Sequence, residues 1–180
     1  MRAAIMCGGY GTRLRPLTDT VCKPMTDICG KPCLERIIDH LTTFGITDIV
    51  VNVHWLKEQI MEYFGNRLLY YYEPELLGAE ETERRLRPWL GQRYLVLNGD
   101  TLSDVHIKTL ISNPEIYKDS SIACWDREKD VYIGTKLIDT RDIEEGKSPH
   151  RVDHLHTYWI DIGTSLGLEE ARKHYKIIKF

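Results

Sequence analysis

Apolar runs of strand length recur along the chain, and they predict strands at residues 2–6, 48–53, 68–72, 93–97, 120–125, 131–138 and 157–161. Between several of these runs, apolar residues repeat every three or four positions. That spacing predicts a helix from Pro32 to a stop at Gly45, and further helices at residues 56–64, 79–87, 104–111 and 166–177. Strands that alternate with helices indicate βαβ units in an α/β fold with a mostly parallel sheet.

The carboxyl ends of the predicted strands are where a ligand site is expected. In open α/β sheets, ligands bind in the crevice beyond the carboxyl ends of the strands. Here those positions are residues 7–16, residues 98–101 and residues 161–164.

Composition narrows the class of protein. The 180 residues suggest one domain, and the net charge of −3 argues against a dedicated nucleic-acid binder. No apolar run approaches the roughly 18 residues of a membrane helix, and the first residues are too short for a signal peptide. We therefore expect a cytoplasmic protein without a membrane partner. The five cysteines include no C-x-x-C pair, so reduced thiols are favoured over a zinc site.

The first ligand-site segment is a glycine-rich loop, CGGYGTRLRPLT at residues 7–18. Glycines let backbone N–H groups surround phosphate oxygens, and Arg13, Arg15 and Lys23 add cationic groups that suit a polyphosphate. A Walker loop is absent, and the dinucleotide fingerprint fails because Leu14 occupies its third glycine position. From the loop alone, an ordinary surface turn stays open as an alternative.

The loop also resembles a family signature. GGYGTRLRPLT, followed by KPM and GKP, is similar to the motif of the sugar-1-phosphate nucleotidyltransferases. VNVHWLKEQI, YEPELLG, LVLNGD and YWIDIGT resemble further blocks of that family in the same order, most closely its bacterial hexose- and heptose-1-phosphate branch. The resemblance implies a three-layer, Rossmann-like nucleotidyltransferase fold over residues 1–180. It also implies Mg²⁺-dependent transfer of a nucleotidyl group from a nucleoside triphosphate to a sugar 1-phosphate.

The resemblance implies roles for individual residues. Arg13 would reach the β- and γ-phosphates, Lys23 the α-phosphate, and Asp100 and Asp161 would hold the metal, with Arg13, Lys23 and Asp100 as the catalytic set. From the residues alone, each aspartate is more readily explained as an ordinary turn former or helix cap, and Asp100 precedes a predicted helix. The implied nucleotide contacts are Gly8, Gly9, Gly11, Thr12, Arg13, Glu73, Gly78, Asn98 and Gly99.

The chain departs from the family pattern in two places. Where relatives read L-G-T-x-G-G, this chain has Leu77–Thr82, with Glu80 and Glu81 facing solvent or accepting hydrogen bonds from guanine. The stretch between Asp100 and Asp161 is shorter than expected for the family. Lys129 in that stretch is either the ligand of the sugar phosphate or a solvated charge. His150, His154 and His156 are interpreted as loop histidines rather than metal ligands.

Two alternatives remain at this stage. A shortened acceptor region would suit a smaller phosphorylated acceptor such as phosphocholine. It would also suit a non-catalytic homologue that only binds nucleotide, although a protein of that kind has little need for Arg13, Lys23, Asp100 and Asp161 together. The sequence specifies neither the base nor the sugar, and it leaves a homodimer open as the assembly.

Overall fold

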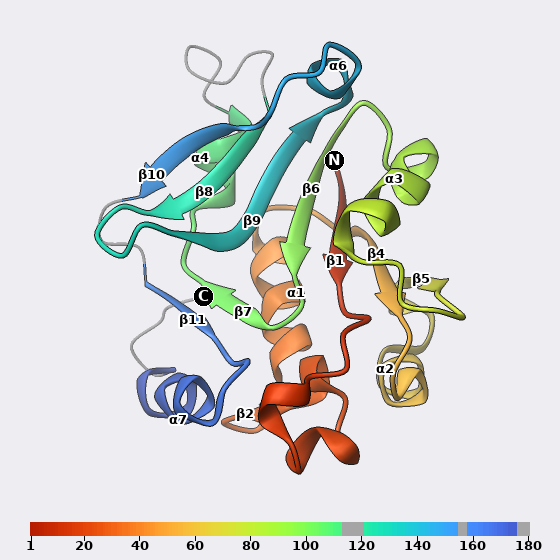
Figure 1. The fold of residues 1–180 in the computed structure, drawn as a ribbon, viewed down its shortest axis with the longest axis vertical. Helices are drawn as coiled ribbons and strands as arrows, with labels where there is room; N and C mark the ends of the chain where they lie inside the picture. Colours follow the sequence, from red (N-terminus) through yellow and green to blue (C-terminus); the bar gives the residue numbers. More distant parts are fainter. Residues whose placement is uncertain (113–120, 155–157, 176–180) are drawn as a thin grey trace.

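The computed structural model describes residues 1–112, 121–154 and 158–175. Seven strands form one sheet in the order β10-β8-β9-β6-β1-β4-β5 (Figure 1). All neighbours are parallel except that β9 runs antiparallel to both β8 and β6. The α/β class with a mostly parallel sheet is therefore confirmed. The strands are β1 Arg2–Met6, β4 Asp48–Val53, β5 Leu69–Tyr72, β6 Arg93–Asn98, β8 Ile122–Asp126, β9 Val131–Asp139 and β10 His150–His154.

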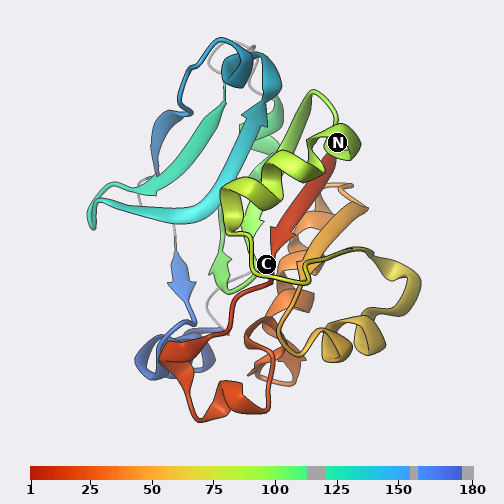
Figure 2. The same ribbon diagram turned by 45° about the vertical axis from the view of Figure 1, so that its right-hand side comes forward.

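Helices cover both faces of this sheet, which makes three layers (Figure 2). Alternate residues of β1 point to opposite sides. Ala3 and Ile5 belong to the larger core with helices α1, α2, α4 and α7, whereas Ala4 packs in a smaller core with α3. The helices are α1 Cys33–Thr43, α2 Lys57–Phe64, α3 Ala79–Leu90, α4 Ile107–Ser112, α6 Thr140–Glu144 and α7 Ser165–His174. In the part of the chain that the structure describes, no helix is long and apolar enough to cross a membrane.

Several elements differ from the sequence-based expectation. Strand β7 Thr101–Ser103, which pairs antiparallel with β11 Trp159–Asp161, precedes α4, and the helix expected from residue 104 begins at Ile107. The interpretation of His150 and His154 as loop residues was wrong, because both lie in the edge strand β10. Its sequence, His-Arg-Val-Asp-His, lacks apolar alternation, and the strand forms by pairing with β8. His156 lies outside the described residues.

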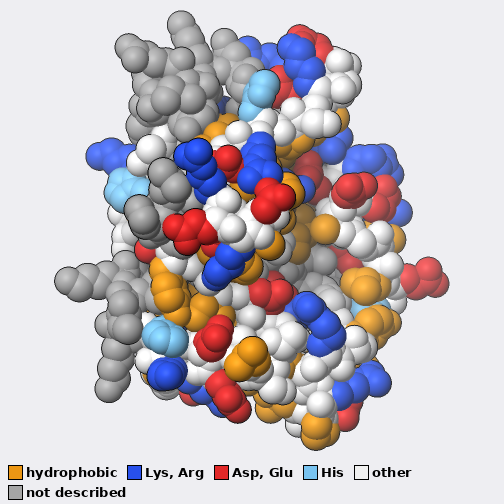
Figure 3. All heavy atoms as spheres, turned by 60° about the vertical axis from the view of Figure 1, so that its left-hand side comes forward, with side chains coloured by type: hydrophobic (Ala, Val, Ile, Leu, Met, Phe, Trp, Pro, Cys, Tyr) orange, Lys and Arg blue, Asp and Glu red, His pale blue; other side chains and the backbone are white. Residues whose placement is uncertain are grey.

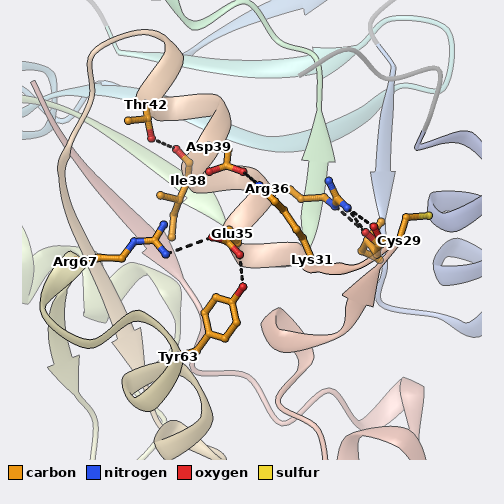
Figure 4. A network of polar contacts seen from close by, with 10 residues as sticks. Cys29, Lys31, Glu35, Arg36, Ile38, Asp39, Thr42, Tyr63 and Arg67 are labelled. Carbon is orange, nitrogen blue, oxygen red and sulfur yellow. Dashed lines mark hydrogen bonds and ion pairs between the residues drawn. The ribbon is translucent and has the colours of Figure 1, made fainter.

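The beginning of α1 is anchored by a network of polar contacts (Figure 4). The buried guanidinium of Arg36 donates to the backbone oxygens of Ile28 and Cys29 and stacks 3.4 Å from the ring centre of Tyr175. Ile28 and Cys29 belong to the hairpin of β2 Asp27–Ile28 and β3 Lys31–Pro32, and Tyr175 follows α7. Arg36 therefore ties the end of α7, and with it the segment after β11, to the first half of the chain.

Candidate active site

The glycine-rich loop meets the end of β6 at the carboxyl edge of the sheet. Met6, the last residue of β1, is paired with Asn98 of β6 and with Asn52 of β4. The backbone N–H of Gly99 donates to the carbonyl oxygen of Met6 at 2.9 Å. Parallel pairing thus brings the loop that follows β1 beside the residues that follow β6.

The loop folds back on itself through Gly11. This residue has a φ of +66°, a conformation that favours glycine. A Cβ atom there would lie 2.8 Å from Cγ2 of Thr18 and 3.2 Å from Cβ of Lys23. Thr18 also donates its hydroxyl to the carbonyl oxygen of Gly11 at 2.8 Å. Gly11 is therefore the position that allows the loop to pack against the segment carrying Lys23.

Four charged residues from three segments meet at this edge. The ammonium of Lys23, almost fully buried, forms an ion pair with Asp100 and lies 3.7 Å from Oδ1 of Asp161. The guanidinium of Arg13 lies 3.6 Å from Oδ2 of Asp161, and its side chain is 64% exposed. The β7–β11 pair aligns Asp161 with Thr101, directly after Asp100. Tertiary structure therefore places Arg13, Lys23 and the two predicted metal carboxylates in one cluster. Arg15, the third cation predicted for a polyphosphate, instead pairs with Asp19, with Nε 3.0 Å from Oδ1.

The helix-cap alternative for Asp100 is wrong. The residue is followed by strand β7, and α4 begins seven positions later at Ile107. Its carboxylate accepts hydrogen bonds from the side chains of Lys23 and Thr101 instead. A cap would accept a hydrogen bond from a backbone N–H in the first turn of its helix.

A pocket of about 170 Å³ opens beside this cluster. Its walls come from the glycine-rich loop, the segment around Lys23, Asp100 and the turn after β11, and it is lined by Met6, Cys7, Gly9, Gly11, Thr12, Arg13, Lys23, Pro24, Asp100 and Gly163. Burial raises the pKa of the Cys7 thiol well above its usual range, and the neighbouring Cys22 and Asp100 raise it further. Cys7 is thus a neutral wall residue rather than a thiolate nucleophile.

The donor set at the pocket fits a magnesium ion. Asp100 and Asp161 share one cation, the ammonium of Lys23, so an oxygen atom of each carboxylate lies near the same cation position. Magnesium is typically held by one or two carboxylates together with substrate phosphates and water. Among residues 1–112, 121–154 and 158–175, no group of three or more His, Cys, Asp or Glu side chains could hold a metal ion by itself. The pair therefore suits a metal that arrives with a phosphate-bearing substrate.

Glu73, one of the implied nucleotide contacts, is completely buried. Its carboxylate accepts hydrogen bonds from Asn52 Nδ2 at 3.1 Å, from the Thr82 hydroxyl, and from the backbone N–H of Leu77 at 3.4 Å. A Cβ atom on Gly8 would lie 3.4 Å from Glu73 Oε2 and 2.7 Å from Asn52 Nδ2. The side chain of Glu73 therefore braces the loop from Leu77 to Thr82 directly behind the phosphate loop.

The loop where the chain departs from the family pattern leads into α3. Gly78 precedes the helix with a φ of +85°. Glu80 is exposed, and the carboxylate of Glu81 accepts hydrogen bonds from Arg84 and Arg85, which lower its pKa to about 2. Glu81 is thus an ionised carboxylate on the helix surface, and its charge is balanced by the two arginines. The side chain of Asn98 lies on the other side of the site, against Gly134 of β9.

Lys129 lies apart from the phosphate pocket but near the strand that carries Asp161. Its ammonium is 5.2 Å from the ring centre of Trp159 and 3.9 Å from Oδ2 of Asp126. Trp159 and Asp161 are two positions apart on β11 and so point to the same side. Asp126 accepts a hydrogen bond from the Trp159 indole at 2.7 Å and from two backbone N–H groups of the turn that carries Lys129, and these donors lower its pKa.

The molecular face around β8, β10, β11 and α7 carries mixed charge (Figure 3). Lysine and arginine side chains are interspersed there with aspartate and glutamate, and apolar side chains gather near them. A second pocket of about 220 Å³ lies at β11 and α7, lined by Lys129, Tyr158, Trp159, Ile160, Glu170 and His174. The described part of this face thus carries no continuous basic surface of the kind that nucleic acids need.

Comparison with known families agrees with this geometry. The sequence profile described as nucleotidyl transferase matches residues 2–131, which include the glycine-rich loop, Lys23 and Asp100. The chain belongs to this family. Asp161 lies beyond the residues that the family profile matches, and its place in the cluster comes from the structure.

Two curated relatives of this chain are named as enzymes that act on sugar phosphates. The chain is 41% identical over 113 residues to the N-acetylmuramate alpha-1-phosphate uridylyltransferase of Neisseria meningitidis, covering 58% of this chain and 49% of the relative. It is 36% identical over 118 residues to the D-glycero-alpha-D-manno-heptose 1-phosphate guanylyltransferase of Campylobacter jejuni, covering 63% and 53%. The chain thus spans about half the length of the curated relatives it matches.

Solved structures show the same fold at low identity. HddC from Yersinia pseudotuberculosis superposes with a TM-score of 0.78 at 20% identity, covering 97% of this chain and 99% of that chain. A UDP-glucose pyrophosphorylase from Acinetobacter superposes with a TM-score of 0.81 at 14% identity, covering 97% and 92%. The nucleotidyltransferase fold expected from the sequence is therefore confirmed.

Two residues at the site, Gly163 and Trp159, were not among the candidates predicted from the sequence. A Cβ atom on Gly163 would lie 2.6 Å from Arg13 Nη2 and 2.7 Å from both Lys23 Nζ and Asp161 Oδ1. Trp159 lies on the same strand as Asp161, with the Lys129 ammonium 5.2 Å from its ring centre. Both residues belong to the YWIDIGT block; Gly163 lies within the expected ligand segment 161–164, but only Asp161 was singled out there. Close approach of three side chains to one glycine has no signature in the sequence.

Proposed function

We propose that this chain transfers a nucleotidyl group from a nucleoside triphosphate to a sugar 1-phosphate and releases pyrophosphate. The observation that carries the proposal is the cluster of Arg13, Lys23, Asp100 and Asp161 beside the pocket of the glycine-rich loop. The reaction joins two polyanions, so its main requirement is charge neutralisation together with alignment. Paired cations and paired carboxylates at the end of a glycine-rich loop meet that requirement.

In this reaction an oxygen of the sugar phosphate attacks the α-phosphorus of the triphosphate. A new P–O bond forms, and the bond from the α-phosphorus to the bridging oxygen of the β-phosphate breaks, so pyrophosphate leaves with that electron pair. The attacking oxygen is already an anion, and no general base is needed. We assign Lys23 to the α-phosphate and Arg13, with its planar fork of donors, to the β- and γ-phosphates.

Asp100 and Asp161 would hold Mg²⁺, which when bound supplies positive charge to the phosphate oxygens. Lys23 now neutralises the same two carboxylates. Its ammonium is therefore free to turn to the α-phosphate once those carboxylates have another cation. The glycine backbone at Gly8, Gly9 and Gly11 and the adjacent Thr12 would surround the triphosphate, whereas Gly78, Asn98 and Gly99 would border the nucleoside. The buried carboxylate of Glu73 would act there through the loop from Leu77 to Thr82 that it braces.

The surroundings of Lys129 favour a sugar phosphate over phosphocholine as the acceptor. A choline cation is recognised on the faces of aromatic rings. Here the Lys129 ammonium already lies over the Trp159 ring, where it repels a second cation and attracts an anion. Tyr158, Glu170 and His174 line the same pocket and offer hydrogen-bonding groups for sugar hydroxyls.

The decisive experiment is a matrix of nucleoside triphosphates against acceptors, with pyrophosphate release measured with and without Mg²⁺. UTP and GTP come first, because the two relatives are named as a uridylyltransferase and a guanylyltransferase. The acceptors are N-acetylmuramate, glucose and heptose 1-phosphates, with phosphocholine as the competing class. Pyrophosphate release with a sugar 1-phosphate supports the proposal, whereas nucleotide binding without release in any pair indicates a non-catalytic homologue.

A single domain over residues 1–180, a cytoplasmic location and a homodimer stay predictions.

A further inference from the structure

The turn between β4 and α2, together with the first turn of α2, holds the phosphate loop from outside through side chains. The amide of Gln59 donates to the carbonyl oxygen of Thr20 at 2.7 Å and accepts from the backbone N–H of Cys22 at 2.8 Å. The indole of Trp55 donates to the carbonyl oxygen of Thr18 at 3.0 Å. These side chains therefore bind the backbone on the stretch that leads directly to Lys23.

A further contact reaches the glycine-rich part of the loop. His54 Nδ1 lies 2.8 Å from the carbonyl oxygen of Glu73, and Nε2 lies 2.9 Å from the hydroxyl of Tyr10. A carbonyl oxygen only accepts, so Nδ1 carries the hydrogen, and in the neutral ring Nε2 accepts from Tyr10. The ring of Tyr10 also packs edge-on against His54. His54 thus links the phosphate loop to the segment on the nucleoside side.

The backbone of the turn is shaped to present these side chains. Leu56, between Trp55 and the start of α2, has a φ of +50°. Residues with a side chain rarely adopt this left-handed conformation, and when they do it is often at functional positions. The sharp turn at Leu56 lets Trp55, which precedes it, and Gln59, which follows it, contact the same stretch of the phosphate loop at residues 18–22.

We propose that Gln59 is a positioning residue, which acts on the reaction through Lys23. Two hydrogen bonds from one amide fix the backbone on both sides of Val21, and Cys22 is the residue directly before Lys23. Lys23 is nearly buried, so the direction in which its side chain leaves the backbone decides whether the ammonium reaches the two carboxylates. This inference rests on the proposed function for its kinetic consequences, but the backbone clamp itself can be measured without turnover.

The first measurement is amide hydrogen exchange in the Gln59→Leu variant, which keeps the side-chain size and removes both hydrogen bonds. We expect peptides covering residues 18–23 to exchange about tenfold faster or more, with peptides from β1 and β6 unchanged. Gln92→Leu is the matched control, because Gln92 is exposed at the opposite end of β6. Unchanged exchange at residues 18–23 would overturn the proposal. If Gln59→Leu does not fold, Gln59→Glu, which keeps the acceptor for Cys22, takes its place.

The second measurement is kinetic. We expect kcat/KM for the nucleotide to fall about tenfold to a hundredfold in Gln59→Leu, with an unchanged acceptor KM and partial rescue in Gln59→Glu. In a Lys23→Ala background, Gln59→Leu should cost nothing further, because the two residues act as one unit. Losses that add in the double variant would overturn the assignment to Lys23.

Failure of the proposed function has a separate signature. If the wild-type protein releases no pyrophosphate with any substrate pair, binding of UTP and GTP with Mg²⁺ replaces turnover as the readout. A loss of affinity of about tenfold in Gln59→Leu then supports the positioning of Lys23. Equal affinity in Gln59→Leu and wild type would overturn it.

Discussion

Gly163→Ala should disable the site while leaving the fold intact. Gly163 does not have a positive φ, so alanine can adopt its backbone conformation without strain. The added methyl group, however, would lie 2.6–2.7 Å from the ends of the Arg13, Lys23 and Asp161 side chains. Each of these groups would have to move by about 0.7–0.8 Å to reach an ordinary contact of 3.4 Å.

The cost of this displacement falls on catalysis rather than on stability. The Arg13 and Lys23 side chains are long and flexible, and the short Asp161 side chain is 40% exposed, so we expect the unfolding free energy to change by less than about 1 kcal/mol. A misplacement of about 1 Å in catalytic groups can lower a rate roughly a hundredfold, which corresponds to about 2.7 kcal/mol of transition-state stabilisation. The expected result is therefore a kcat about two orders of magnitude lower at an almost unchanged melting temperature.

The assay is pyrophosphate release under saturating Mg²⁺, nucleotide and sugar 1-phosphate, together with thermal unfolding of the same samples. Leu166→Ala is the control, because this exposed residue lies three positions along the chain and contributes nothing to the pocket. A Gly163→Ala enzyme with wild-type kcat would refute the reasoning. It would mean that the reaction does not depend on where Arg13, Lys23 and Asp161 lie relative to the turn after β11.

The remaining predictions concern the charged groups. Asp100→Asn and Asp161→Asn should each lower turnover by roughly two orders of magnitude or more and weaken nucleotide binding only modestly, as measured by calorimetry; wild-type turnover in Asp161→Asn would remove that residue from the metal pair. Arg13→Lys should be no better than Arg13→Ala in kcat/KM, because an ammonium lacks the planar fork, and activity equal to wild type would reduce Arg13 to a diffuse charge. Lys129→Ala should raise the acceptor KM about tenfold to a hundredfold without changing the nucleotide KM, whereas exposed Lys108→Ala should change neither; an unchanged acceptor KM in Lys129→Ala would sink its assignment.

The strands and helices of the first hundred residues follow from local apolar pattern. Residues 2–6 and 48–53 are apolar runs with β-branched residues, and the structure has β1 and β4 at those residues. The helix expected after Pro32 corresponds to α1, with its apolar face in the core. Such elements are predictable because their periodicity and end signals lie within a few residues of one another.

The sequence also predicted where along the chain the candidate ligand residues lie. Asp100 and Asp161 follow apolar strand sequences, and parallel sheets gather strand ends at one edge. Glycines, arginines and a lysine in one short loop suggest a phosphate ligand by their chemistry alone. What the pattern could not decide was whether Asp100 caps a helix, since an aspartate before a threonine fits either role.

Only the tertiary structure decided the contacts between distant segments. The polar strand β10 exists because β8 offers it backbone partners, and Lys23 is buried because two carboxylates from residues 100 and 161 surround it. Gly163 must be glycine because three side chains from elsewhere converge on it, and Gln59 serves a loop almost forty residues earlier in the chain. The physical reason is range: backbone pairing, ion pairs and steric exclusion act through space, and residues far apart in sequence meet only once the sheet has assembled.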